Sequence, residues 1–70
     1  MRYSKYEDVS NESLCAVIDN WIKGERNRAI MKRRLIDLIT YERIAEEFDL
    51  SASHVKTIVY HGEDIIFKHL

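Results

Sequence analysis

Residues 41–60, with the sequence YERIAEEFDLSASHVKTIVY, constrain the fold of this chain more than any other segment. Ile44 and Phe48 lie four positions apart, which is the spacing of neighbouring side chains on one face of a helix. They predict the buried face of a short helix, and the small side chain of Ala45 allows a second helix to approach it closely.

The next residues predict a tight corner and then a second helix. Leu50 is expected to fill the corner, and Ser51 is a favourable residue for capping a helix N-terminus. The side chains expected to face back toward the first helix are those of Val55, Ile58 and Val59. Two short helices that meet across such a turn form a helix–turn–helix. In DNA-binding versions of this motif, the second helix enters the major groove.

The composition places this motif in one small, helix-rich domain. Seventy residues allow a single domain, and the chain has no proline and only two glycines, which favours helices joined by short turns. Cys15 is the only cysteine, which excludes an internal disulfide and a multi-cysteine zinc site. No apolar run approaches the roughly 18 residues of a membrane span, and the N-terminus lacks a signal-peptide core. We expect a soluble cytoplasmic domain with no membrane partner.

The periodicity predicts a small all-α bundle of about four helices. We expect residues 1–9 to form the least ordered part, an N-terminal arm, and residues 10–70 to form one helix–turn–helix domain. Ser10 and Thr40 are expected helix caps, and Gly24 is expected to end the first helix. The expected helices cover residues 11–23, 26–38, 41–48 and about 52–69.

Apolar residues on the first two helices predict their core faces. On the first helix, Trp21 is the largest apolar side chain and is assigned to the core, with Cys15 at the edge of the same face. On the second helix, the residues assigned to the buried side are Ala29, Ile30, Leu35 and Leu38.

The C-terminal segment has two interpretations. Residues 57–60 and 65–67 could form the strands of a β-hairpin, which would add a wing to the helix–turn–helix. A period of three and four residues runs through the segment, however, at Val55, Ile58, Val59, Gly62, Ile65, Ile66 and His69. We therefore favour one long terminal helix. Gly62 could kink it, because a mid-helix glycine costs about 1 kcal/mol relative to alanine.

The charged residues are unevenly distributed, although the formal net charge is only −1. Residues 23–34 contain six basic side chains and one acidic side chain, whereas residues 41–50 contain four acidic side chains and one basic side chain. Basic residues in the first run that could contact DNA phosphates include Arg26, Arg28, Lys32 and Arg33. The alternative is a solvated helix face with ion pairs along it.

The outward side of the motif's second helix predicts a polar surface for DNA. Ser51 caps this helix, and free backbone N–H groups at its N-terminus can meet a phosphate. The outward side chains are those of Ser53, His54, Lys56, Thr57 and Tyr60. Lys56 can reach guanine or phosphate, and the hydroxyl and imidazole groups can hydrogen-bond to base edges. The alternative is that these side chains are simply a solvated face.

No pattern in the sequence indicates an enzyme. The chain shows no nucleophile with a partner base, no phosphate-binding glycine loop and no paired carboxylates of a cleft. On one helix, His54 and His61 would lie roughly 10 Å apart along the axis, too far to share a metal ion. We therefore expect no catalytic residue, no metal, no cofactor and no small-molecule substrate.

The segment LITYERIAEEFDLSASHVKTIVY resembles the fourth conserved region of bacterial sigma factors, where a Tyr-Glu-x-Ile-Ala helix leads to Leu-Ser-x-x-x-Val-Lys. The matching residues are Tyr41, Glu42, Ile44, Ala45, Leu50, Ser51, Val55 and Lys56. Most of the chain is similar to small sigma-like helix–turn–helix proteins encoded by phages and prophages of Firmicutes. The resemblance implies a tri-helical core within four helices, DNA binding by the terminal helix, and transcriptional control. Seventy residues leave no room for a promoter-melting region, which favours a stand-alone regulator over a sigma factor.

Two functions are expected from these patterns. The preferred one is a transcriptional regulator that binds double-stranded DNA. The alternative is a protein-interaction module that keeps the helix–turn–helix fold and binds RNA polymerase or a phage regulator through its acidic third helix. A homodimer is compatible with DNA binding, because helix–turn–helix proteins often occupy paired half-sites as dimers.

Overall fold

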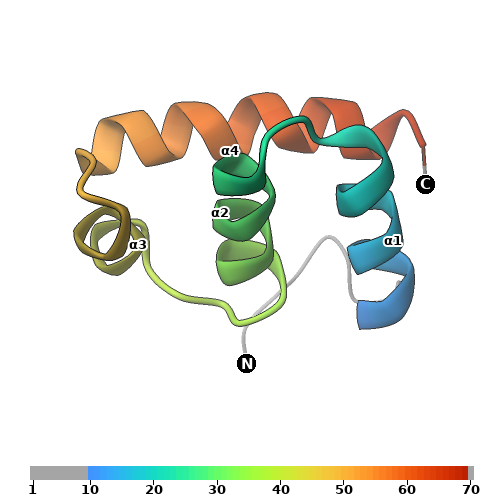
Figure 1. Ribbon diagram of the computed structural model, residues 1–70, viewed down its shortest axis with the longest axis horizontal. Coiled ribbons are helices and arrows are strands. Elements are labelled where there is room, and N and C mark those ends of the chain that lie inside the picture. Colours follow the sequence, from blue (N-terminus) through green and yellow to red (C-terminus); the bar gives the residue numbers. More distant parts are fainter. Residues whose placement is uncertain (1–9, 70) are drawn as a thin grey trace.

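The computed structural model describes residues 10–69, and this part of the chain forms four helices (Figure 1). They are α1 (Asn11–Trp21), α2 (Glu25–Leu35), α3 (Tyr41–Phe48) and α4 (Ala52–Phe67). The expected all-α bundle is confirmed. The expected N-terminal arm, residues 1–9, lies outside the described residues.

Hydroxyl side chains begin three of the helices. Ser10, Thr40 and Ser51 each have an extended backbone, and each side-chain oxygen accepts a hydrogen bond from the N–H three residues later, at 3.1 to 3.2 Å. Each cap satisfies a donor that the first turn of a helix otherwise leaves without a partner. All three predicted caps are confirmed.

The boundary between α1 and α2 differs from the prediction. α1 ends at Trp21 rather than at residue 23, because Ile22 takes an extended conformation that buries its side chain in the core, with 5% exposed. Gly24 does not end α1. With φ at +89° it precedes α2 and serves as its N-cap, and this left-handed value suits a residue without a Cβ atom.

The end of α2 is also earlier than predicted. α2 ends at Leu35 rather than at residue 38, and the chain then curls back so that the Ile39 N–H donates to the Arg33 carbonyl at 3.1 Å. Leu38 adopts a left-handed φ of +59° and is 49% exposed. Its assignment to the buried face was therefore wrong, because the helical period on which it relied stops three residues earlier.

The hydrophobic core draws on all four helices and on Ile22. Its members are Leu14, Ile18, Ile22, Ile30, Met31, Ile44, Ala45, Val55, Val59 and Ile66. Partly buried residues, among them Phe48, Leu50 and Ile58, pack against it. The predicted inward faces of the helix–turn–helix are thus confirmed.

Trp21 is not a core residue. Its side chain is 49% exposed, and its ring stacks on the His69 imidazole with centroids 3.6 Å apart and planes within 3°. The prediction failed because Trp21 is the last residue of α1, where the helix no longer faces the core and Ile22 takes the buried position instead. Cys15, assigned to the edge of the same face, is partly buried.

α4 is continuous from Ala52 to Phe67, so the β-hairpin wing is wrong and the helix ends two residues before the predicted limit. Gly62 is buried in the middle of it, where α4 crosses α2. A Cβ atom built on Gly62 would lie 2.6 Å from the Met31 sulfur, so the glycine permits this close approach. The glycine therefore has a packing role in an unbroken helix.

α4 spans the molecule, and the other three helices all pack against one side of it (Figure 1). α3 is seen nearly end-on while α4 runs across the view, so the two helices of the motif cross steeply. The whole is a thin slab with extents of 32 × 30 × 17 Å. The opposite side of α4 is left uncovered by residues 10–69.

No helix among residues 10–69 combines the length and the hydropathy that a membrane span requires.

Candidate nucleic-acid interface

The outward side chains predicted on α4 all reach solvent. These exposed residues are Ser53, His54, Lys56, Thr57 and Tyr60. Within the helix, the Thr57 hydroxyl donates to the Ser53 carbonyl at 3.1 Å, which leaves the Thr57 oxygen as an acceptor toward solvent. Ser51 is exposed as well, but its oxygen is occupied as the cap of α4.

Tyr41, the first residue of α3, brings two of these α4 side chains together with a residue of α2. Its ring makes an edge-to-face contact with Tyr60, with centroids 6.2 Å apart and an interplanar angle of 81°. The Arg34 guanidinium carbon lies 4.2 Å from the Tyr41 ring centroid, and the Lys56 Nζ lies 5.7 Å from it. Both distances are within the range of cation–π attraction. We call Arg34, Tyr41, Lys56 and Tyr60 the tyrosine–cation cluster.

The cluster is held by the connection between α2 and α3. Nη1 of Arg34 donates to the Ile39 carbonyl at 3.0 Å, which fixes the guanidinium against the segment leading into α3. Burial raises the pKa of the Tyr41 hydroxyl above its usual value, and the Arg34 charge only partly opposes this. The hydroxyl therefore remains neutral at physiological pH and can both donate and accept hydrogen bonds.

Three of the four upstream basic residues are engaged within the protein. Nε of Arg28 donates to the Ile22 carbonyl at 2.8 Å, which ties the start of α2 to the end of α1. Lys32 pairs with Asp19 at 2.8 Å, and hydrogen bonding to this carboxylate raises the pKa of Lys32. These side chains link α1 to α2 in addition to any contact they make outside.

Arg33 is the most heavily paired of these residues. Its guanidinium binds Glu47 of α3 through two nitrogens, with an Nε–Oε1 distance of 2.9 Å, and binds Asp37 at 3.1 Å. These carboxylates raise the pKa of Arg33, and Arg33 lowers the pKa of Glu47. Arg26 differs, since it is exposed and, among residues 10–69, donates only from Nε to the Asn27 side chain at 3.3 Å.

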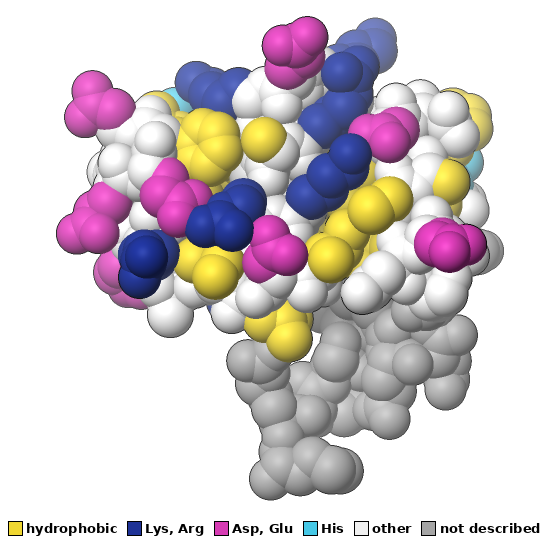
Figure 2. Space-filling view, turned by 60° about the horizontal axis from the view of Figure 1, so that its bottom comes forward, with side chains coloured by type: hydrophobic (Ala, Val, Ile, Leu, Met, Phe, Trp, Pro, Cys, Tyr) yellow, Lys and Arg dark blue, Asp and Glu magenta, His cyan; other side chains and the backbone are white. Residues whose placement is uncertain are grey.

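Arg34 is the basic residue of α2 that the structure brings to Tyr41, and sequence reasoning missed it. Its position depends on α2 ending at Leu35 and on the chain curling back to Ile39, neither of which the periodicity showed. The structure does not bring Arg26, Arg28, Lys32 or Arg33 into the cluster with Lys56. Figure 2 shows a run of lysine and arginine side chains from the upper edge to the middle of the face it presents, with aspartate and glutamate side chains on both sides of it.

α3 presents carboxylates beside this surface. Glu42, Glu46 and Asp49 are all exposed. Asp49 ends α3 with a left-handed φ of +57°. The electrostatic field near the start of α4 is therefore mixed in sign, and any affinity for phosphate depends on local cations rather than on net charge.

No group of three or more potential metal-ligating side chains occurs within residues 10–69. The chain matches no family model, no curated protein and no solved structure in the comparisons made with each.

Proposed function

We propose that this protein binds double-stranded DNA through the outward side of α4 and acts as a transcriptional regulator. The observation that carries the proposal is the tyrosine–cation cluster, in which two cations and two tyrosines from three helices meet beside the exposed α4 face. The resemblance of residues 41–60 to the fourth region of sigma factors supports the same function.

The cluster supplies the chemistry that duplex DNA requires. Lys56 and Arg34 offer positive charge for phosphate oxygens, and the Tyr60 hydroxyl adds a donor and acceptor at the same place. On the adjoining turn of α4, the exposed side chains of Ser53 and Thr57 can hydrogen-bond to base edges. Few cations take part, so we expect modest affinity with a small salt dependence compared with strongly basic DNA-binding domains.

The test is a fluorescence-anisotropy titration of a labelled mixed-sequence duplex at several salt concentrations. Lys56→Ala is expected to weaken binding several-fold and to reduce the slope of log K against log salt by about 1, because one phosphate contact is lost. Arg34→Ala should produce the same change, although it had no place among the residues predicted from sequence.

Lys68→Ala is the matched control, since Lys68 is exposed and lies twelve residues beyond Lys56 at the end of α4, roughly 18 Å away. It should leave affinity and slope close to those of the native chain. Circular dichroism of each variant shows whether the helices persist, which matters most for Arg34 because it also binds the Ile39 carbonyl. If the native chain shows no duplex binding at micromolar concentration and low salt, the proposal is wrong.

The exposed carboxylates of α3 favour a second candidate, a protein-interaction module that binds RNA polymerase or another regulator. Glu42→Gln together with Glu46→Gln should then abolish capture of the partner from nuclease-treated host lysate, while leaving DNA affinity unchanged or slightly higher. Capture of DNA alone counts against this candidate.

A further inference from the structure

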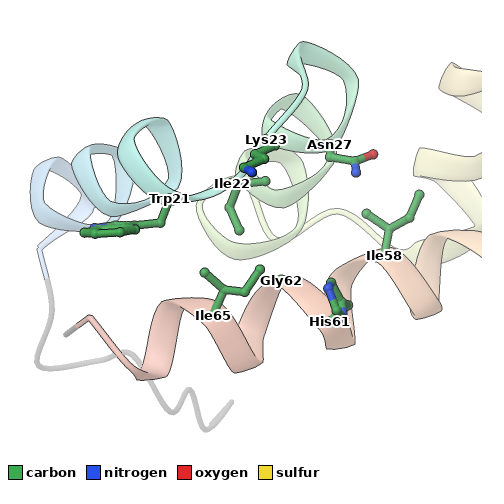
Figure 3. Close-up of a pocket in the computed structure, with 8 residues that line it drawn as sticks. All are labelled: Trp21, Ile22, Lys23, Asn27, Ile58, His61, Gly62 and Ile65. Carbon is green, nitrogen blue, oxygen red and sulfur yellow. The ribbon is translucent and has the colours of Figure 1, made fainter.

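A groove of about 380 Å³ lies between α4 and the end of α1, the α1–α2 connection and the start of α2 (Figure 3). It is lined by Trp21, Ile22, Lys23, Asn27, Ile58, His61, Gly62 and Ile65. With about 3.6 residues per turn, the Ile58, His61 and Ile65 positions fall on the opposite flank of α4 from Lys56 and Tyr60. The groove is thus separate from the tyrosine–cation cluster, and a ligand bound in it does not depend on the proposed DNA binding.

Part of the groove's wall is apolar, and this part is not fully covered by residues 10–69. Trp21 stands at one edge with about half of its surface exposed, and Ile58 and Ile65 of α4 are only partly buried. Apolar surface grouped in a concave site is more informative than single exposed residues, because it favours an apolar occupant.

The polar side chains of the groove offer positive charge and hydrogen-bond donors. Lys23 and His61 make no hydrogen bond or ion pair with other residues in the 10–69 range. The Asn27 carbonyl oxygen accepts from Arg26, which leaves its NH₂ group as a donor. No carboxylate lines the groove.

The backbone at this end of the groove also offers hydrogen-bond donors. α2 begins at Glu25 without a side-chain cap, because its N-cap is Gly24. The N–H groups of its first turn therefore lack the partner that a capping oxygen would supply, and they contribute positive potential near Lys23 and Asn27, which the Glu25 carboxylate of the same turn partly offsets.

We propose that this groove binds a small amphiphilic anion, with an aromatic or aliphatic body against Trp21, Ile58 and Ile65 and a carboxylate toward Lys23 and Asn27. Free phosphate and the DNA backbone would leave the apolar walls uncovered. An uncharged apolar molecule would leave Lys23 and His61 without a partner. The volume is at the lower end of the roughly 300–1,000 Å³ usual for ligand sites, which suits a small ligand.

The test compares 4-phenylbutyrate with 4-phenylbutan-1-ol, which has the same body without the charge. Trp21 is the only tryptophan, so its fluorescence reports directly on the groove, and amide chemical shifts in NMR locate the ligand. We expect saturable binding of the acid, with shifts confined to the lining residues and affinity at least three-fold higher than that of the alcohol.

Lys23→Gln should weaken binding of the acid at least three-fold and leave the alcohol unaffected. Arg43→Gln, which removes a cation on α3, is the matched control and should change neither affinity. Trp21→Leu should weaken both ligands, with NMR as the readout. Equal binding of acid and alcohol, shifts spread outside the groove, or no saturable binding by the native chain would each overturn the proposal.

Discussion

At the scale of single residues, backbone conformation rather than side-chain contact determines which residue types are favourable at two positions. Leu38 and Asp49 have φ values of +59° and +57°, in the left-handed region that costs most L-residues about 1–2 kcal/mol. At Asp49 the conformation ends α3, where the Leu50 N–H donates to the Ala45 carbonyl at 2.9 Å in a Schellman-type bond. Aspartate tolerates the region better than most residues, whereas leucine does not.

Leu38→Asn is therefore expected to raise the free energy of unfolding by about 0.5–1 kcal/mol, since asparagine tolerates the left-handed region. Leu38 is about half exposed, so little apolar contact is lost. Leu38→Ala is the control, because it removes the same apolar atoms but keeps a Cβ atom that is strained there. Urea unfolding measures both variants, and equal stability of the two would show that backbone strain is not the cause.

At the scale of elements, the crossing of α2 and α4 depends on the absence of a side chain at Gly62. Met31 is fully buried, and its terminal atoms occupy the space beside Gly62. A methyl group there would meet the Met31 sulfur at 2.6 Å and its Cε at 2.7 Å. Helix propensity favours alanine at this position and packing opposes it, so the measured sign tells which effect is larger.

We expect packing to prevail. Gly62→Ala should lower the free energy of unfolding by up to about 2 kcal/mol, because overpacking a core costs about 1–3 kcal/mol and the propensity gain offsets about 1 kcal/mol of this. In a Met31→Ala background the added methyl enters vacated space, and the same substitution should be stabilising by about 1 kcal/mol. Urea titrations of all four chains form the double-mutant cycle, and an equal effect in both backgrounds would contradict the explanation.

These elements also show what the sequence can predict. The three hydroxyl caps and the period of α4 are local signals, so the helices and the inward faces of Val55 and Val59 were predicted correctly. The ends of α1 and α2 were not, because they depend on Ile22 and Ile39 turning back toward the rest of the chain.

In the candidate site too, local features were predicted from the sequence, and contacts between helices were not. Exposure of Lys56 and Tyr60 comes from helical period and was predicted. Their contact with Tyr41 and the approach of Arg34 depend on how three helices meet, which no local pattern contains. The groove beside Trp21 was missed for the same reason, since an apolar residue at the end of a helix gives no sign of what lies opposite.

At the scale of the whole molecule, ion pairs link the helices that pack beneath α4. Asp19–Lys32 joins α1 to α2, and Arg33–Glu47 joins α2 to α3. Single exposed pairs contribute little to stability, but a carboxylate held by a bidentate arginine makes stability depend on pH. The Arg33–Glu47 pair also competes with any phosphate for the same guanidinium. Basic side chains of α2 thus take part both in ion pairs that link the helices and in the proposed DNA binding.

The ion pair of Glu47 determines how the free energy of unfolding changes with pH. Arg33 holds the pKa of Glu47 below its usual value of 4.5, so the folded state favours the carboxylate. The resulting stabilisation is present above pH 4.5 and is lost as pH falls through the lower pKa of the folded state. Glu47→Gln should therefore be less stable than the native chain at pH 7, and the difference in stability should shrink as pH falls below 4.5 and through the lower pKa of the folded state. Glu46→Gln is the matched control, because Glu46 is exposed and has no ion pair with residues 10–69. Urea midpoints across this range measure the effect, and a gap between native and Glu47→Gln that stays constant with pH would mean that the pair does not stabilise the fold.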